Sequence, residues 1–136
     1  MTTPDGSALL GCWALVSCRE EGGGPETEVF GADSVGQLQY TPEGRMSASL
    51  MSRSWPQMDI NEEWRVGQYI SYTGVWKLVD GCVRHEVQTA SVPAWVGREF
   101  VRAARLEGDI LTLSVDPKTS GSGETIPHVL VWRKIA

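Results

Sequence analysis

From Gln68 to Gly97 the chain reads QYISYTGVWKLVDGCVRHEVQTASVPAWVG, which is two runs of strand-forming residues on either side of Asp80-Gly81. An Asp-Gly pair flanked by alternating apolar residues is the strongest short-range signal for a β-hairpin. Because side chains alternate between the faces of a strand, Tyr72 and His85 fall on the apolar faces of the two runs. A polar side chain on a core-facing stripe needs a partner inside the protein or a cavity to face. The stretch therefore predicts a hairpin that carries Tyr72 and His85 into the interior.

The same alternation recurs along the rest of the chain, with turn-forming residues between the runs. The strands expected outside the hairpin are Leu9–Glu21, Thr27–Phe30, Gly36–Thr41, Arg45–Met51, Glu99–Leu106, Ile110–Val115 and His128–Lys134. Asp59 followed by Glu62 resembles a capping box, and Gly67 suits a helix C-terminus, so one short helix is predicted over Asp59–Val66. About eight short strands at hairpin spacing are typical of an antiparallel barrel or sandwich.

Polar groups on the inward faces favour the barrel. By strand parity the inward set mixes large apolar side chains with Ser17, Arg19, Tyr40, Tyr72, His85, Arg102 and His128. A solid sandwich core does not tolerate so many polar groups, whereas a barrel of about eight strands can hold one small ligand. We therefore expect residues 1–136 to form a single all-β domain, an antiparallel barrel with one short helix.

Length and charge limit the classes of function. The 136 residues fit one domain, and the net charge of −5 comes without a cluster of Lys and Arg. A nucleic-acid partner is not expected, because phosphates need a basic footprint. The N-terminus lacks the basic start and apolar run of a secretory signal, and no apolar run approaches the roughly 18 residues of a membrane span. These features predict a cytoplasmic protein with no membrane span.

The chemistry-bearing motifs of many enzymes are missing from the sequence. Cys12, Cys18 and Cys82 are an odd count that indicates reduced thiols, and no Cys or His spacing suggests zinc. No dinucleotide, phosphate-loop or Gly-x-Ser-x-Gly fingerprint is present. We expect no metal, no cofactor and no hydrolase chemistry.

Several segments resemble a known family. Gly11-Cys12-Trp13 resembles the Gly-x-Trp signature of lipocalins and their calycin relatives, and Trp132-Arg133 resembles the closing basic residue that packs over that Trp. More specific is Phe30–Met51, FGADSVGQLQYTPEGRMSASLM, which is similar to the signature block of the bacterial and fungal lipocalin-like domain family. The same family pattern is matched by YTGVW at Tyr72–Trp76, VRHEV at Val83–Val87, VPAWVG at Val92–Gly97, Arg102, and LVW at Leu130–Trp132.

The resemblance covers the chain from Gly11 to Lys134 and implies a calycin-like barrel with an internal pocket. Members look like binders of small apolar molecules, and some resemble cyclases or isomerases of specialised-metabolite pathways. The chain departs from the pattern at Arg45, where the family often has His, and in the shortened region between Met51 and Gln68. Whether residues 52–67 form a lid over the pocket is left open.

Three inward residues could carry chemistry. His85 has an ordinary pKa near 6.5, so it is either a general acid or base, or a core histidine bonded to a backbone carbonyl. Arg102 either holds a carboxylate or a developing oxyanion, or forms an internal ion pair or stacks on Trp95. Tyr72 either orients a carbonyl through its hydroxyl or is a buried tyrosine with one hydrogen bond.

Other inward residues are expected to shape the pocket or contact the ligand: Tyr40, Trp76, Trp95, His128, Ser17 and Phe100. Trp13 and Trp132 are expected to pack at the closed end of the barrel. The predicted function is the binding of a small, apolar, carbonyl-bearing molecule by a cofactor-free cyclase or isomerase of polyketide or terpenoid type. The alternative is a non-catalytic carrier or sensor of a similar ligand. A homodimer is left open.

Overall fold

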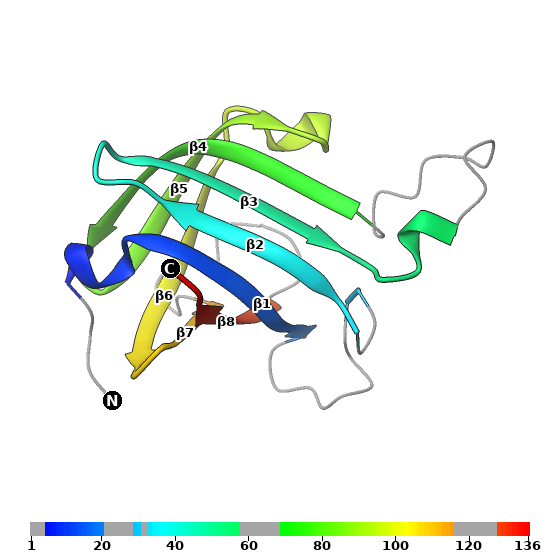
Figure 1. Ribbon diagram of the computed structural model, residues 1–136. Coiled ribbons are helices and arrows are strands. Elements are labelled where there is room, and N and C mark those ends of the chain that lie inside the picture. Colours follow the sequence, from blue (N-terminus) through cyan, green and yellow to red (C-terminus); the bar gives the residue numbers. More distant parts are fainter. Residues whose placement is uncertain (1–4, 21–28, 31–32, 58–68, 116–127) are drawn as a thin grey trace.

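The described part of the chain forms a closed antiparallel barrel of eight strands (Figure 1). The computed structural model describes residues 5–20, 29–30, 33–57, 69–115 and 128–136. The strands are β1 (Gly11–Glu20), β2 (Val35–Tyr40), β3 (Arg45–Met51), β4 (Tyr69–Val79), β5 (Cys82–Ala90), β6 (Glu99–Glu107), β7 (Ile110–Val115) and β8 (His128–Lys134). Each strand pairs with its successor and β8 pairs with β1, so the expected all-β antiparallel barrel is confirmed.

Helical structure in the described residues is limited to short 3-10 turns. These are η1 (Gly6–Leu9), η3 (Trp55–Gln57) and η5 (Pro93–Trp95), and none is long or apolar enough to cross a membrane. The helix expected over Asp59–Val66 lies outside the described residues. Of the strand expected at Thr27–Phe30, only Val29 and Phe30 are described, and they lie in a turn.

The β4–β5 hairpin forms at Asp80-Gly81 as predicted. Asp80 has φ 52° and Gly81 has φ 78°, the two positive values that a type I′ turn requires. Trp76 lies opposite His85 in this pair, and both side chains are buried. Side chains that alternate along each strand from this turn therefore face inward where the sequence predicts it.

A bulge interrupts the same hairpin beside Gly74. The register passes from Thr73 opposite Thr89 to Gly74 opposite Val87, which leaves Gln88 on β5 as the extra residue. A Cβ atom at position 74 would meet the backbone carbonyl oxygen of Glu86. Glycine is required here by the close approach of the two backbones.

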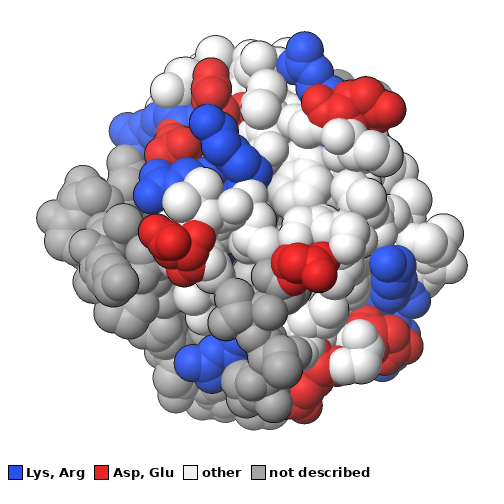
Figure 2. All heavy atoms as spheres, turned by 90° about the vertical axis from the view of Figure 1, so that its left-hand side faces the viewer, with Lys and Arg blue, Asp and Glu red and all other residues white. Residues whose placement is uncertain are grey.

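The connections divide the barrel into two ends. Short turns at 41–44, 80–81 and 108–109 lie at one end, where Figure 1 shows the β2–β3 turn and η1, and the β5–β6 connection with η5 lies at the other. Figure 2 views the end with the short turns, where acidic and basic side chains are interspersed among uncharged ones. This face offers no extended field of one sign.

Trp13 fills the interior at this closed end. It is 0% exposed, and its Nε1 donates to the backbone oxygen of Leu9 in η1 at 3.0 Å. The cation above its ring is Lys134, whose Nζ lies 5.4 Å from the ring centroid, and the expectation for Arg133 is wrong. Alternation explains the difference, because Trp132 and Lys134 share one face of β8 while Arg133 is exposed on the other.

We predict that Gly74→Ala lowers the free energy of unfolding by about 2–3 kcal/mol, as expected when an extra methyl group is forced against backbone. The matched control is Gly6→Ala, since a Cβ at position 6 meets nothing within 4 Å. Urea unfolding followed by tryptophan fluorescence measures both. Equal stability of the two variants would contradict the close approach at Gly74.

Candidate functional site

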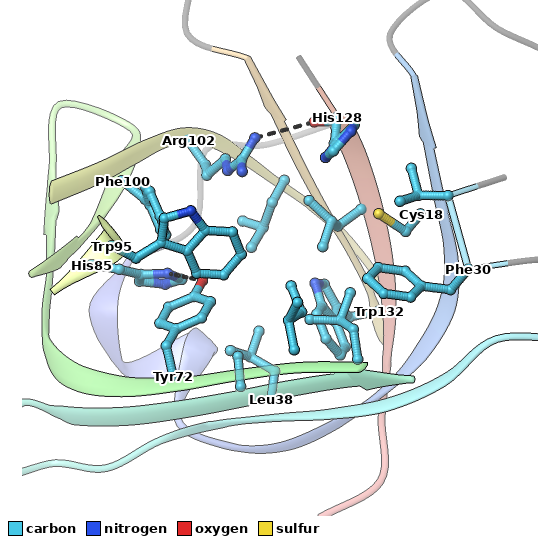
Figure 3. Close-up of a pocket in the computed structure, with 16 residues that line it drawn as sticks. Cys18, Phe30, Leu38, Tyr72, His85, Trp95, Phe100, Arg102, His128 and Trp132 are labelled. Atoms are coloured by element: carbon cyan, nitrogen blue, oxygen red, sulfur yellow. Dashed lines mark hydrogen bonds between the residues drawn. The ribbon is translucent and has the colours of Figure 1, made fainter. Parts of the chain in front are cut away.

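A cavity of about 330 Å³ lies inside the barrel (Figure 3). Its wall is mostly apolar, with residues such as Leu38, Leu50, Ile70, Leu113 and Leu130. The polar side chains in the wall are Tyr72, His85, Arg102 and His128. A mostly apolar concave site with a few polar groups is typical of small-molecule binding. The volume of this cavity is near the lower end of the range for ligand pockets.

His85 lies between two tyrosine hydroxyls contributed by different strands. Its Nε2 is 2.7 Å from the hydroxyl oxygen of Tyr40 on β2, and its Nδ1 is 2.9 Å from that of Tyr72 on β4. The histidine on β5 is 2% exposed, so both ring nitrogens are occupied inside the protein. The alternative of a bond to a backbone carbonyl is therefore not what the structure shows.

The direction of these hydrogen bonds follows from counting protons. Tyr40 is 2% exposed, and within the described residues the hydrogen-bond partner of its hydroxyl group is Nε2 of His85. A buried O–H without an acceptor is costly, so Tyr40 donates to Nε2. The neutral imidazole then carries its proton on Nδ1 and donates to the oxygen of Tyr72. The hydroxyl proton of Tyr72 is left free to point into the cavity.

The side chains of Tyr40, His85 and Tyr72 are all neutral near pH 7. Burial, with a smaller effect from the charge of Arg102, lowers the pKa of His85 to about 3. Burial raises the pKa of Tyr72 to about 12 and that of Tyr40 well above its ordinary value. The series Tyr40–His85–Tyr72 therefore presents a hydrogen-bond donor to the cavity without a formal charge.

Arg102 brings a positive charge to the same cavity. On β6 it lies opposite Val83, two positions beyond Phe100, which lies opposite His85. Its Nη1 donates to the backbone oxygen of His128 at 3.3 Å, and within the described part of the chain it pairs with no carboxylate. Of the alternatives, an ion pair is thus not seen among these residues, and several guanidinium N–H groups remain available.

His128 lies beside Arg102 at the start of β8. Burial lowers the pKa of the His128 imidazole, the charge of Arg102 lowers it further, and Glu20 opposes them. The imidazole therefore favours its neutral form, which avoids a second positive charge next to the guanidinium.

Two aromatic rings, which also pack on each other, hold the position of the Tyr72 side chain. Trp95 of η5 meets Tyr72 edge-on at 6.0 Å between centroids, and Phe100 meets Tyr72 in the same way at 5.4 Å. Trp95 and Phe100 also pack edge-on at 5.4 Å. Such edge-to-face contacts are favourable and directional, so they limit where the Tyr72 hydroxyl can point.

The structure brings most of the predicted site residues to one cavity. Those in its wall are Tyr72, His85, Arg102, Trp95, Phe100 and His128. Tyr40 and Trp76 are not in the wall: they pack on each other at 4.5 Å between centroids, and Tyr40 supports His85 from behind. The structure thus places both residues behind the wall, and their contact with a ligand stays a prediction.

Ser17 is the other expected contact that the wall lacks. Val16 is an extra residue in β1, because the pairing with β8 passes from Leu15 opposite Trp132 to Ser17 opposite Val131. The bulge shifts the alternation, so Cys18, 2% exposed, lines the cavity instead. Arg19 loses its expected inward place for the same reason.

Two aromatic residues in the wall were not expected to contact a ligand. Trp132 was expected to pack at the closed end, and Phe30 was given no role, yet both line the cavity. Strand parity could have placed Trp132, because it shares a face with His128 and Leu130. Phe30 lies in a turn, where parity gives no information.

Comparison with known proteins identifies the class. Residues 10–135 match the model of the lipocalin-like domain family, and the chain belongs to this family. One relative is the 4'-hydroxy-3'-methoxypropiophenone carrier protein of Aspergillus oryzae. It is 32% identical over 107 residues, and the match covers 66% of this chain and 96% of the relative.

We predict that His85 makes the fold sensitive to acid. Its pKa is 6.5 for an ordinary histidine and about 3 in the folded protein, so between these values the unfolded chain binds a proton that the folded chain does not. The free energy of unfolding should therefore fall by about 1 kcal/mol per pH unit between about pH 6 and pH 5 through this residue alone.

Urea unfolding at several pH values tests this prediction with two variants. His85→Phe should show a shallower loss of stability than the wild type by that amount. His128→Phe is the control, because it removes the other histidine and keeps the His85 contribution. Parallel curves for wild type and His85→Phe would contradict a depressed pKa at His85.

Proposed function

We propose that this protein binds a small, mostly apolar molecule with a carbonyl group and releases it unchanged, as a carrier or sensor. The observation that supports this most is the Tyr72 hydroxyl group, which lies in the wall of an apolar cavity within hydrogen-bond distance of His85. The hydrogen-bond directions inferred above leave its proton for a ligand. A carbonyl buried in such a cavity would lose its bonds to water unless a donor replaced them. Tyr72 supplies that donor at a fixed position.

The residues behind Tyr72 strengthen it as a donor. Its oxygen accepts from His85 and so becomes more polarised, because hydrogen bonds in a chain reinforce one another where the dielectric is low. Arg102 adds a positive charge on the same cavity, which favours the negative end of a carbonyl dipole. The apolar wall suits the rest of the molecule.

The relative from A. oryzae supports the same class of ligand. Its name describes it as the carrier of 4'-hydroxy-3'-methoxypropiophenone, an aryl ketone whose ring also bears a hydroxyl and a methoxy group. This combination of groups matches the wall and the donor of the present cavity, so an aryl ketone is a suitable first probe.

A cofactor-free cyclase or isomerase is the second candidate. What favours it is that Tyr72 and Arg102 face one cavity, where together they could stabilise an enolate oxygen. Such a reaction also needs a group to take a proton near neutral pH. His85 is poorly suited, because its pKa is about 3 and both of its nitrogens already hold tyrosine hydroxyls. We therefore prefer the carrier and assign His85 to positioning Tyr72.

We predict that Tyr72→Phe weakens the binding of 4'-hydroxy-3'-methoxypropiophenone about 5–10-fold, the usual effect of losing one neutral hydrogen bond. Isothermal titration calorimetry measures the dissociation constants. Tyr69→Phe is the matched control, since Tyr69 stacks on Trp55 and does not line the cavity. Equal affinity of wild type and Tyr72→Phe would contradict the role of the Tyr72 hydroxyl.

The same mixtures separate the two candidate functions. After prolonged incubation with the wild-type protein, chromatography and mass spectrometry should recover the ketone unchanged. A product that forms with the wild type and not with Arg102→Met would instead support the enzyme.

A further inference from the structure

Trp132 carries an unused hydrogen-bond donor in the cavity wall. The residue is 1% exposed, and its Nε1 is buried without a partner among the described residues. In Figure 3 the indole nitrogen lies on the edge of the ring that faces the space between the labelled side chains. The buried donor therefore lies on the side of the ring that faces the cavity.

The other tryptophans inside the barrel show that this is an exception. Nε1 of Trp13 donates to the backbone oxygen of Leu9, and Nε1 of Trp76 donates to that of Thr41, each at 3.0 Å. An indole N–H can only donate, and leaving it unpaired in the interior costs roughly as much as losing a hydrogen bond. Among these three buried indoles, the one that lacks a partner is the one in the cavity wall, where a bound molecule can supply the acceptor.

Trp132 also lies at a different depth from the polar groups described above. Along β8 it lies beyond His128 and Leu130, toward Lys134 and the closed end, while Arg102 donates to the oxygen of His128 at the other end of the strand. Tyr72 and Trp132 thus offer two separate donors with apolar wall between them. Ser34, whose Oγ is the other buried polar atom without a partner among the described residues, does not line the cavity.

We propose that the ligand carries two acceptor oxygens, a carbonyl held by Tyr72 and a second, deeper oxygen that receives the N–H of Trp132. This inference rests on the proposed function and narrows it to one ligand class. The class is an aryl ketone with an ether or hydroxyl oxygen on its ring, remote from the carbonyl. A ketone without the ring oxygen leaves Trp132 unpaired and binds more weakly.

Two probes that differ in one group test the second contact. Propiophenone has the carbonyl alone, whereas 4'-methoxypropiophenone adds an oxygen that accepts but does not donate and bears no charge. In calorimetry, Trp132→Phe should weaken binding of the methoxy ketone about 3–10-fold and leave propiophenone within about 2-fold. Trp55→Phe is the matched control, because Trp55 does not line the cavity.

Nuclear magnetic resonance of the wild-type protein gives a readout that does not depend on a variant tolerating the substitution. The indole N–H resonance of Trp132, assigned by its absence from Trp132→Phe or by sequential assignment, should move downfield with the methoxy ketone and less with propiophenone. Equal effects of Trp132→Phe on both ketones, or an unmoved indole resonance, overturn the second contact and leave the carbonyl contact standing. Failure of both ketones to bind the wild type overturns the proposed function and this inference together.

Discussion

The pairing of β1 with β8 is the constraint on which the rest of the structure depends. It runs from Trp13 opposite Lys134 to Glu20 opposite His128 and turns eight strands into one closed wall. Closure removes the sheet edges, and it also turns the inward side chains toward one shared interior. Each inward polar group must then find a partner across the interior or a ligand within it.

The polar groups in the wall meet this constraint in different ways. Tyr40, His85 and Tyr72 come from three strands and satisfy one another, and burial keeps all three neutral near pH 7. Arg102 cannot become neutral, and it contacts a backbone carbonyl while facing the cavity. The result is a site with donors and a positive charge in which both nitrogens of His85 are already occupied, which suits holding a carbonyl better than changing it.

The alternation of side chains along each strand is what made the inward-facing residues predictable from the sequence. The Asp80-Gly81 turn fixed the register of the central hairpin, and the inward places of Tyr72, His85 and Arg102 followed from it. Alternation fails where a residue is inserted, and Val16 in β1 moved Cys18 into the wall in place of Ser17. The bond between Tyr40 and His85 was also beyond reach, because it joins β2 and β5, which are not neighbours in the barrel. Parity gives the face of a residue but not which side chain it meets across the interior.

Infrared spectroscopy of a bound ketone tests the central claim most directly, namely that a neutral donor in the wall holds the carbonyl of the ligand. Propiophenone labelled with carbon-13 at the carbonyl gives a stretching band that can be separated from the protein by difference. The account predicts a band at lower frequency than in an alkane solvent, because a hydrogen bond from Tyr72 weakens the carbonyl bond. A bound ketone whose band stays at the alkane frequency would contradict it.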